Sequence, residues 1–258
     1  MKFFARFIFI TATIALMACS AFAGVSTLDD LKSAKVGVVR SSIAESLLRG
    51  IMIESQDKIL TYNDLTTLFA GLKSGEVDAV VMDESPARFF MANETGLKIL
   101  PETLESTYYG IAFKKGNTLR DDVNKALAEL KEDGTLSTII SKYLHVDEPD
   151  PEAIDFNQGA EGGKLWVGCS AVFPPYEMRT DKGFAGIDIE LCAAIAKKLN
   201  KELVVVDYRF SILPEALESG RIDMICSAFN ITEEREKVMD FSEPYDADQQ
   251  VILVLADK

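Results

Sequence analysis

The cysteines and the single histidine are the residues of this chain best suited to nucleophilic or metal chemistry. The sequence contains four cysteines and one histidine, His145. A Ser-His-Asp triad, or a metal site with several histidines, therefore has little to build on. The three cysteines beyond the N-terminal segment form no C-x-x-C pair, which is typical of neither a zinc site nor a disulfide framework. We expect no catalytic residue, no metal ion and no cofactor.

The positions of these three cysteines indicate structural roles. Cys192 lies on the apolar face of a predicted helix over residues 187–199, where a thiol behaves as a small buried hydrophobe. Cys169 and Cys226 each end a predicted strand and could come close to each other. A disulfide between Cys169 and Cys226 is therefore left open.

The first 23 residues have the features of an export signal. Lys2 and Arg6 flank a short basic region, the apolar run 7–17 follows, and residues 21–23 form an A-x-A cleavage site. The apolar run is too short for a membrane span. We expect export to the periplasm with cleavage before Gly24. Residues 16–19 also resemble a lipoprotein box, so lipid anchoring at Cys19 is the alternative.

The overall composition is that of a folded, acidic protein. Hydrophobic residues make up 48% of the 258 residues, and the formal net charge is -14. The hydrophobic content argues against disorder, and the negative charge argues against nucleic acid as a partner. The length suffices for one large domain or for two lobes of ordinary size.

Short apolar strands alternate with amphipathic helices along most of the chain. We predict strands over residues 35–39, 77–82, 164–169, 203–206 and 222–226, and helices over 43–53, 63–73, 84–92, 119–131, 187–199 and 212–218. Thr118 is the expected N-cap of the helix 119–131, and Gly134 the expected stop. This alternation predicts a mainly parallel sheet with helices on both faces, an α/β fold.

An internal sequence repeat predicts two related units. Residues 72–78 and 217–223 share the pattern of a helix end, a Ser-Gly stop and a strand that opens with aspartate. Between them, residues 146–163 are rich in proline, glycine and acidic residues and predict a surface linker. Doubly wound sheets bind ligands beyond the carboxyl ends of their strands, so two facing units would form a small-molecule cleft.

The second half of the chain carries an ordered set of motifs that resembles a known family. The motifs are Val167-Gly168-Cys169, Phe173-Pro174-Pro175-Tyr176-Glu177, Gly183-Phe184-Ala185-Gly186-Ile187-Asp188, residues 217–223, Ile231-Thr232-Glu233-Glu234-Arg235 and Asp240-Phe241-Ser242-Glu243-Pro244-Tyr245. They resemble the N-terminal portion of the polar amino-acid-binding proteins of ABC importers, bacterial extracellular solute-binding protein family 3. The first half resembles the remainder of that family at residues 28–31, 80–86 and 109–113.

The resemblance implies a periplasmic-binding-protein-like type II fold in which two doubly wound α/β lobes are joined by a two-crossover hinge. The halves are exchanged relative to the family, which implies a circular permutation with residues 146–163 as the joining linker. One lobe would then comprise residues 25–104 and 250–258, and the other 110–245. The crossovers would lie at 105–109 and 246–249. A fragment of a tandem array is the alternative explanation.

The resemblance also implies how an amino acid would be held. Arg235 matches the position that binds the ligand carboxylate, and a guanidinium suits a carboxylate because it can form two parallel hydrogen bonds. Asp83 matches the position that accepts the α-ammonium group. The structural alternatives are a solvated arginine on a helix over residues 232–237 and an N-cap aspartate. Since Arg235 and Asp83 would belong to opposite lobes, both would reach one ligand only in a closed cleft.

Other family positions imply the remaining contacts. Phe173 and Phe210 match the aromatic walls around the ligand side chain. Ser227, Ala228, Asn230 and Thr232 match a stretch that supplies hydrogen bonds. Ser42, Ile43 and Ala44 occupy a loop before a helix, where amide groups can receive a carboxylate. Ile43 stands where the family commonly has threonine, so that hydroxyl contact is lost.

Two positions bear on ligand preference and function. Ser170 stands where relatives that bind basic or amide ligands carry aspartate, and Arg40 stands where a glutamine-binding relative carries lysine. Together they favour a polar neutral or acidic L-amino acid over a basic one, although Arg40 could equally extend into solvent. We expect a monomeric binding protein that serves an ABC transporter permease. The alternatives are a cyclohexadienyl dehydratase-like enzyme, with Asp83 and Glu177 as candidate acids, and a detached sensor domain.

Overall fold

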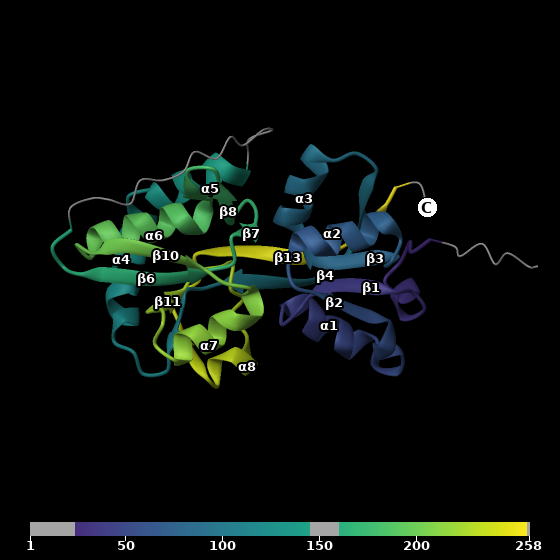
Figure 1. Cartoon of the computed structure of the whole chain (residues 1–258), viewed down its shortest axis with the longest axis horizontal. Coiled ribbons are helices and arrows are strands. Elements are labelled where there is room, and N and C mark those ends of the chain that lie inside the picture. The colour runs from purple at the N-terminus through teal and green to yellow at the C-terminus, as the bar shows by residue number, and fades with distance from the viewer. Residues whose placement is uncertain (1–23, 145–159, 257–258) are drawn as a thin grey trace, which may run out of the picture.

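The structure is a computed structural model that describes residues 24–144 and 160–256. The export signal, Cys19, His145 and most of the predicted linker 146–163 lie outside these residues. The strands form two five-stranded sheets and a separate three-stranded hairpin sheet. In Figure 1 the two large sheets belong to two lobes that lie side by side along the long axis.

The first lobe is built by the beginning and the end of the chain. Its elements are η1 (Asp29–Lys32), β1 (Val36–Val39), α1 (Ile43–Ile51), η2 (Ile53–Lys58), β2 (Ile59–Tyr62), α2 (Leu65–Ser74), β3 (Ala79–Asp83), α3 (Glu84–Asn93), β4 (Leu97–Tyr109) and β13 (Asp246–Leu255). The strand order is β2-β1-β3-β13-β4. Strands β2, β1 and β3 are parallel, and β13 runs antiparallel to both β3 and β4.

The second lobe is built by the middle of the chain. Its elements are β5 (Ala112–Lys114), α4 (Leu119–Glu132), α5 (Thr135–Leu144), β6 (Lys164–Cys169), β7 (Val172–Phe173), β8 (Glu177–Thr180), β9 (Gly183–Ala185), α6 (Ile187–Lys198), β10 (Glu202–Asp207), η3 (Phe210–Ile212), α7 (Leu213–Glu218), β11 (Met224–Ile225), α8 (Glu233–Glu236) and β12 (Met239–Phe241). The strand order is β10-β6-β11-β5-β12, in which β10, β6 and β11 are parallel. The hairpin sheet is β7-β8-β9.

The two lobes repeat one topology. In each, the first parallel strand lies between the second and the third, so the chain reverses its winding direction beside β1 in one lobe and beside β6 in the other. Such a reversal opens a crevice at the carboxyl ends of the strands. The fold is therefore a pair of doubly wound α/β lobes, as predicted.

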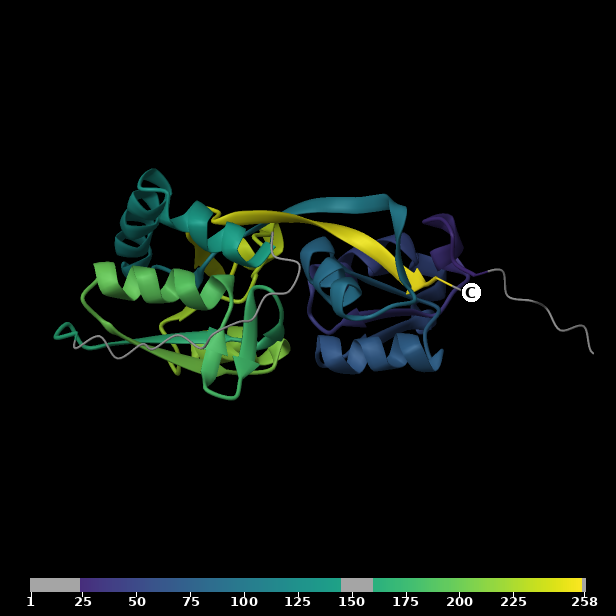
Figure 2. The same cartoon turned by 90° about the horizontal axis from the view of Figure 1, so that it is seen from above.

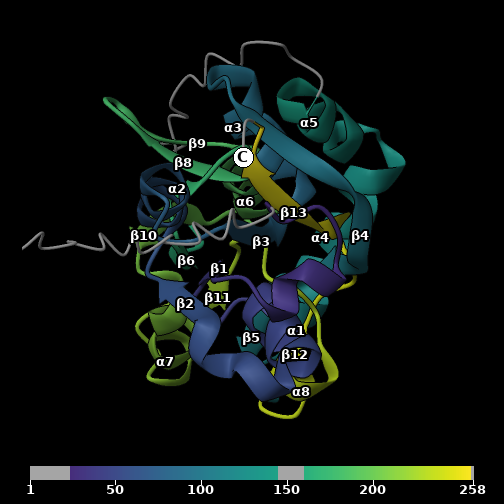
Figure 3. The same ribbon diagram turned by 90° about the vertical axis from the view of Figure 1, so that its right-hand side faces the viewer.

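Helices cover both faces of each sheet (Figures 1 and 3) because neighbouring strand residues point to opposite faces. Val81 packs with Leu48 of α1 on one face of the first sheet, whereas Val80 packs with Leu68 of α2 on the other. In the second lobe, α4, α5 and α6 share one apolar cluster and α7 contributes to another. The period-two pattern of each strand thus fixes which helix it meets.

Local signals explain where the helices of the first lobe begin and end. The Ser42 hydroxyl accepts a hydrogen bond from the Glu45 amide at 3.2 Å and caps α1. The Asp64 carboxylate accepts from the Thr67 amide at 2.8 Å and caps α2. Gly75 ends α2 with φ of 76°, a left-handed conformation that glycine adopts without strain.

The internal sequence repeat, residues 72–78 and 217–223, forms equivalent turns in the two lobes. Asp78 precedes β3, and its carboxylate accepts from the Lys35 amide at 3.0 Å. Asp223 precedes β11, and its carboxylate accepts from the Trp166 amide at 2.8 Å. Each aspartate therefore attaches the start of a third strand to the start of the first strand of its lobe.

Two long strands connect the lobes. β4 and β13 pair along most of their length, with Asp246 opposite Tyr109 and Leu255 opposite Leu97. Figure 2 shows them bridging the two lobes along one side of the molecule. The chain changes sheets between β4 and β5 and again between β12 and β13, so it crosses between the lobes twice.

Several details differ from the sequence-based expectations. Helix α5 was not predicted, although it buries Leu136, Ile139 and Tyr143 in the second lobe. Thr118 occupies the N-cap position of α4 but makes no side-chain cap bond; the side-chain Oδ1 of Asn117 accepts from the Leu119 amide instead. None of the helices in the described ranges is long and apolar enough to cross a membrane.

The three cysteines of the second lobe are buried free thiols. Cys192 is 1% exposed within the main apolar cluster of this lobe, as predicted. The disulfide between Cys169 and Cys226 that the sequence left open is not formed. The Cys226 thiol instead donates to the Asp188 carbonyl oxygen at 3.9 Å.

Candidate functional site

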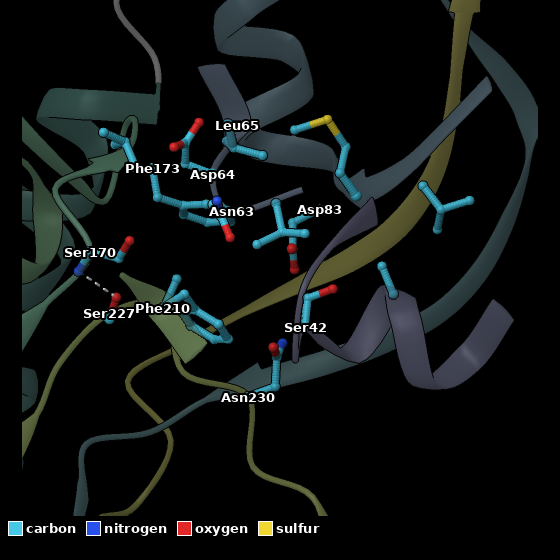
Figure 4. Close-up of a pocket in the computed structure, with 16 residues that line it drawn as sticks. Ser42, Asn63, Asp64, Leu65, Asp83, Ser170, Phe173, Phe210, Ser227 and Asn230 are labelled. Atoms are coloured by element: carbon cyan, nitrogen blue, oxygen red, sulfur yellow. Dashed lines mark hydrogen bonds between the residues drawn. The ribbon is translucent and has the colours of Figure 1, made fainter. Parts of the chain in front are cut away.

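A pocket lies where the loops that follow the parallel strands of the two sheets face each other (Figure 4). It encloses about 530 Å³, part of which is open to solvent. The lining residues all lie at or beyond the carboxyl ends of the six parallel strands: Val39, Ser42, Ala44, Asn63, Asp64, Leu65, Val81, Met82 and Asp83 from the first lobe, and Ser170, Val172, Phe173, Phe210, Ser227, Ala228 and Asn230 from the second.

Most of the residues singled out in the sequence come together in this pocket. Ser42, Ala44, Asp83, Ser170, Phe173, Phe210, Ser227, Ala228 and Asn230 line it. Arg235, Thr232, Ile43 and Arg40 are not among the lining residues. Thr232 caps α8 through its hydroxyl, Ile43 is buried in α1, and Arg40 is exposed on the surface.

Asp83 is buried at the end of β3, with 7% of its surface exposed. Its Oδ1 accepts a hydrogen bond from the Tyr109 hydroxyl and another from the Gln250 amide, each at 2.6 Å. Asp83 also stands at the N-cap position of α3 but makes no side-chain cap bond there. Because both bonds go to Oδ1, the other carboxylate oxygen can still accept from a ligand.

The surroundings of Asp83 disfavour its ionised form. Burial is the main cause, and the charge of Asp248 is the second; together they raise the pKa of Asp83 to about 7. The Tyr109 hydrogen bond opposes this rise. None of the described residues that line the pocket is a cation. A ligand cation beside Asp83 would therefore supply the positive charge that favours its ionised form.

Arg235 lies at the boundary between the lobes rather than in open solvent. Its Nη1 donates to the Asn230 carbonyl oxygen at 2.8 Å, and its guanidinium stacks over the Phe229 ring with its central carbon 4.0 Å from the ring centre. Burial lowers the pKa of Arg235 to about 10, against the charge of Asp83, which raises it. The side chain therefore remains a cation at neutral pH.

A direct bond joins Arg235 to the first lobe. Its Nη2 donates to the Ser41 carbonyl oxygen at 3.0 Å. Ser41 has φ of 63°, a left-handed conformation that is uncommon for serine. The two lobes are thus in contact beside the pocket, and the guanidinium retains further N–H groups for a ligand carboxylate.

Two aromatic rings form part of the pocket wall. Phe173, at the end of β7, packs against apolar residues of both lobes. Phe210, in η3, packs against Phe229 with ring centres 5.3 Å apart. Figure 4 shows the two rings on the side of the pocket formed by the second lobe. Such rings provide an apolar boundary for a ligand side chain.

Serine side chains and amides form the floor on the side of the second lobe. Ser227 accepts from the Ser170 amide at 3.0 Å, and its hydroxyl donates to Glu177 at 2.5 Å. Asn230 donates from its side chain to the Thr107 hydroxyl at 2.9 Å, which ties the floor to the long strand β4. This part of the site is therefore held by internal hydrogen bonds.

Sequence reasoning missed the contribution of the turn between β2 and α2. Asn63, Asp64 and Leu65 line the pocket, but β2 was not recognised as a strand, so its carboxyl end was not searched for site residues. The N-cap pattern of Asp64 before an apolar run was the available signal. No cluster of His, Cys, Asp or Glu suited to a metal ion occurs in the part of the chain that the structure describes.

Comparisons with known proteins match parts of this chain to amino-acid-binding proteins. The Arginine-binding extracellular protein ArtP of Bacillus subtilis is 41% identical over 91 residues, which cover 34% of this chain and 36% of that protein. The L-cystine-binding protein TcyJ of Escherichia coli is 35% identical over 126 residues, which cover 48% of this chain and 46% of that protein. The matched segments thus span between about a third and a half of the length of these relatives.

A solved structure and a family model extend the comparison. The arginine-bound form of domain 1 from TmArgBP is 38% identical, with 41% of this chain and 89% of that chain covered and a TM-score of 0.32. The model of bacterial extracellular solute-binding proteins, family 3, matches residues 43–146 and 165–258. Since these two segments make up most of the sequence, the chain belongs to the bacterial extracellular solute-binding proteins, family 3.

Proposed function

We propose that this protein captures an L-amino acid outside the cytoplasmic membrane and delivers it to an ABC importer. The observation that carries this proposal is a pocket between two lobes with Asp83 on one side and the cation Arg235 beside it on the other. These groups have the charges that an amino-acid zwitterion requires. The names of the relatives, which are arginine- and cystine-binding proteins, support an amino acid as ligand.

Asp83 and Arg235 would hold the backbone of the ligand from opposite lobes. Asp83 accepts the α-ammonium group, and Arg235 donates to the α-carboxylate with the N–H groups that its bonds to Ser41 and Asn230 leave over. The ligand then shifts the population toward the closed form because it contacts both lobes only there. Phe173 and Phe210 enclose its side chain.

The ligand side chain is inferred to be polar and neutral or acidic rather than basic. Ser170 is uncharged, so the floor of the second lobe offers no carboxylate for a basic side chain. Among neutral and acidic ligands we favour the neutral ones, because the Asp64 carboxylate also lines the pocket and repels a second negative charge on the ligand. A basic ligand, as the name of the Bacillus subtilis relative would suggest, is the principal competing result.

The exchanged order of the two halves of the sequence is proposed to result from a circular permutation. Two separate segments match the family model, and each curated relative aligns with only part of the chain. We propose lobes of residues 25–104 with 250–258 and of residues 110–245, joined by residues 105–109 and 246–249. A chain rearranged to begin at residue 164 and to end at residue 146, joined near residues 258 and 24, should fold and bind with the same affinity. Loss of folding in that chain would argue against the permutation.

Export and partners are proposed from the sequence and the family. Cleavage before Gly24 would release the protein into the periplasm, whereas lipidation at Cys19 would anchor it. Mass spectrometry of the protein from cell envelopes distinguishes the two mature forms.

Light scattering tests the expectation of a monomer. Co-purification with a permease would support a role in transport, and co-purification with a receptor would support a role in sensing.

The function is tested by thermal denaturation of the mature protein with each common L-amino acid. A ligand at a hundredfold excess over its Kd stabilises the native state by about 2.7 kcal/mol. Arg235→Ala and Asp83→Ala should abolish this shift. Arg120→Ala, which alters an exposed ion pair on α4, should leave the shift intact. No shift with any amino acid would refute the proposal, and consumption of prephenate would favour the dehydratase alternative.

A further inference from the structure

Two buried carboxyl groups lie directly behind the pocket floor. Glu177 of β8 and Asp188 of α6 are both 0% exposed, and neither lines the pocket. The sequence places both residues in family motifs and offers Glu177 as a candidate acid for an enzyme. Their contacts connect them instead to the floor residues Ser227 and Ala228.

Glu177 orients the serine part of the floor. Its Oε1 accepts from the Ser227 hydroxyl at 2.5 Å, and that hydroxyl oxygen in turn accepts from the Ser170 amide at 3.0 Å. The donor hydrogen of Ser227 is therefore directed away from the pocket and toward Glu177. The loops after β6 and β11 are joined through this one hydroxyl.

Asp188 holds the next residue of the floor. Its Oδ2 accepts from the Ala228 amide at 2.6 Å, and its Oδ1 accepts from the Tyr245 hydroxyl at 2.7 Å. Ala228 has φ of 41°, a left-handed conformation that is strained for alanine. A short bond to a carboxylate offsets this strain, since hydrogen bonds to charged groups are stronger than neutral ones.

The backbone brings the two carboxyl groups together. The Asp188 amide donates to the Tyr176 carbonyl oxygen at 2.9 Å, so the start of α6 lies against the residue that precedes Glu177. Gly186 makes this contact feasible: a Cβ there would lie 2.2 Å from the Tyr176 carbonyl oxygen. The proximity of Glu177 and Asp188 is thus built into the packing of α6.

The titratable groups that face this pair are all acids. They are Cys192 of the same helix, Cys226 after β11, Cys169 of β6, Tyr245, and Asp246 at the start of β13. None of the groups with the largest influence on the two carboxyls is a cation. Two adjacent buried carboxylates without a cation are strongly unfavourable, so the pair retains one proton.

The hydrogen-bond pattern assigns that proton to Glu177. Both oxygens of Asp188 accept from donors, whereas the Oε2 atom of Glu177 is buried without a partner. A proton on Oε2 converts it into a donor that can reach Asp188. Burial, and after it the charge of Asp188, raises the pKa of Glu177 well above its ordinary value.

We propose that Glu177 and Asp188 are positioning residues of the binding site, which share one proton on Glu177 and together hold Ser227 and Ala228 in the shape that receives the ligand. This inference rests on the proposed function for its effect on affinity. The protonation of Glu177 does not depend on any ligand, so it can be tested separately.

Amide substitutions test the assignment because they affect the two positions differently. Glu177→Gln retains a neutral group that can accept from Ser227 and donate to Asp188. Asp188→Asn removes the charge and replaces one acceptor oxygen with an NH₂ group, so either the Ala228 amide loses its acceptor or the Tyr245 hydroxyl must accept instead of donate. In both orientations the charge-assisted support of the Ala228 loop is lost.

The expected result is an asymmetry in ligand affinity, measured with the amino acid found in the screen. Asp188→Asn and Glu177→Ala should each weaken binding by about tenfold or more, whereas Glu177→Gln should have less than about a third of that effect. Asp181→Asn, an exposed carboxyl in the β8–β9 turn, is the matched control. Equal losses from Glu177→Gln and Asp188→Asn would overturn the proposal, since a merely space-filling role predicts equality.

Infrared spectroscopy of the ligand-free protein provides the second measurement, which remains decisive if Asp188→Asn does not fold. Above about pH 8, where Asp83 is mostly ionised, the spectrum should contain the carbonyl band of a protonated carboxyl group. Glu177→Gln should remove this band and Asp181→Asn should not. Persistence of the band in Glu177→Gln, or its absence from the unmodified protein, would refute the assignment even if no amino acid binds.

Discussion

Asp83 should make ligand affinity depend on pH in the neutral range. Burial and the charge of Asp248 raise the pKa of this carboxyl group to about 7 in the ligand-free protein. The proposed ligand ammonium group binds the ionised carboxylate, so binding requires loss of the proton. Affinity is therefore greatest above about pH 7 and falls as the pH decreases below it.

The size of the effect follows from the ionised fraction of Asp83. With a pKa of about 7, roughly nine tenths of the carboxyl groups are ionised at about pH 8 and roughly one hundredth at about pH 5. If only the ionised form binds, affinity falls by about 90-fold over this interval, which corresponds to roughly 2.7 kcal/mol. The charges of a free neutral amino acid do not change appreciably between these values.

Isothermal titration calorimetry at several pH values, in buffers of different ionisation enthalpy, measures both the affinity and the protons released. Asp248→Asn removes the neighbouring charge and should move the midpoint of the profile to lower pH. Asp121→Asn, an exposed carboxyl on α4, should leave the midpoint unchanged. A flat profile, or an unchanged midpoint in Asp248→Asn, would refute the electrostatic reasoning.

The stability of the ligand-free protein should have the opposite pH dependence. The pKa of Asp83 is about 7 in the folded protein, against 3.8 for an aspartate in open solvent. Its contribution to stability is thus fully present below about pH 3.8 and is lost as the pH rises through about 7. Thermal unfolding of Asp83→Asn should show a weaker loss of stability between about pH 5 and pH 8 than the unmodified protein.

Three further substitutions test the packing and the backbone. Gly186→Ala should destabilise the protein by more than about 2 kcal/mol in urea unfolding, because φ is 122° and the new Cβ would lie 2.2 Å from the Tyr176 carbonyl oxygen; a loss below about 0.5 kcal/mol would contradict the close approach. Ser41→Gly should stabilise the protein by up to about 1 kcal/mol, since it relieves a φ of 63°, and a clear loss in the same assay would argue against strain there. Leu127→Ala, at a position with 0% exposure, should cost about 2–5 kcal/mol, and a neutral effect would show that α4 contributes little to the core of the second lobe.

Local features of the fold were predictable from the sequence because neighbouring residues determine them. The apolar period of residues 43–53 predicts α1, which the structure has as Ile43–Ile51. The Ser-Gly pairs of the internal sequence repeat predict the turns before β3 and β11. Burial of Cys192 follows from its place on an apolar helix face.

The pairing of strands that are far apart in the sequence was harder to predict. Buried and exposed side chains do not alternate regularly along the thirteen residues of β4, so the period-two signal that predicts a strand is weak there. Its partner β13 lies at the other end of the chain, and no local pattern specifies that Asp246 pairs with Tyr109. The short strands β2 and β5 likewise lie below the length at which a pattern is distinctive.

The motifs identified Arg235 and Asp83, but their present surroundings depend on the tertiary structure. Arg235 donates to Ser41, which is 194 positions away in the sequence and on the other lobe. Asp83 acquires its raised pKa from burial and from Asp248, which the pairing of β13 with β3 brings near. Neither effect can be read from residue spacing.

The sequence by itself determined the alternation of strands and helices, the α/β class and the residue types available to a zwitterion. Those properties depend on side-chain volume, hydrophobic period and capping, which act over a few residues. Only the tertiary structure decided that the carboxyl ends of six strands surround one pocket, that the buried Glu177 and Asp188 hold its floor, and that Cys169 and Cys226 remain free thiols. Desolvation and charge proximity depend on distance in space, and folding sets that distance independently of separation along the chain.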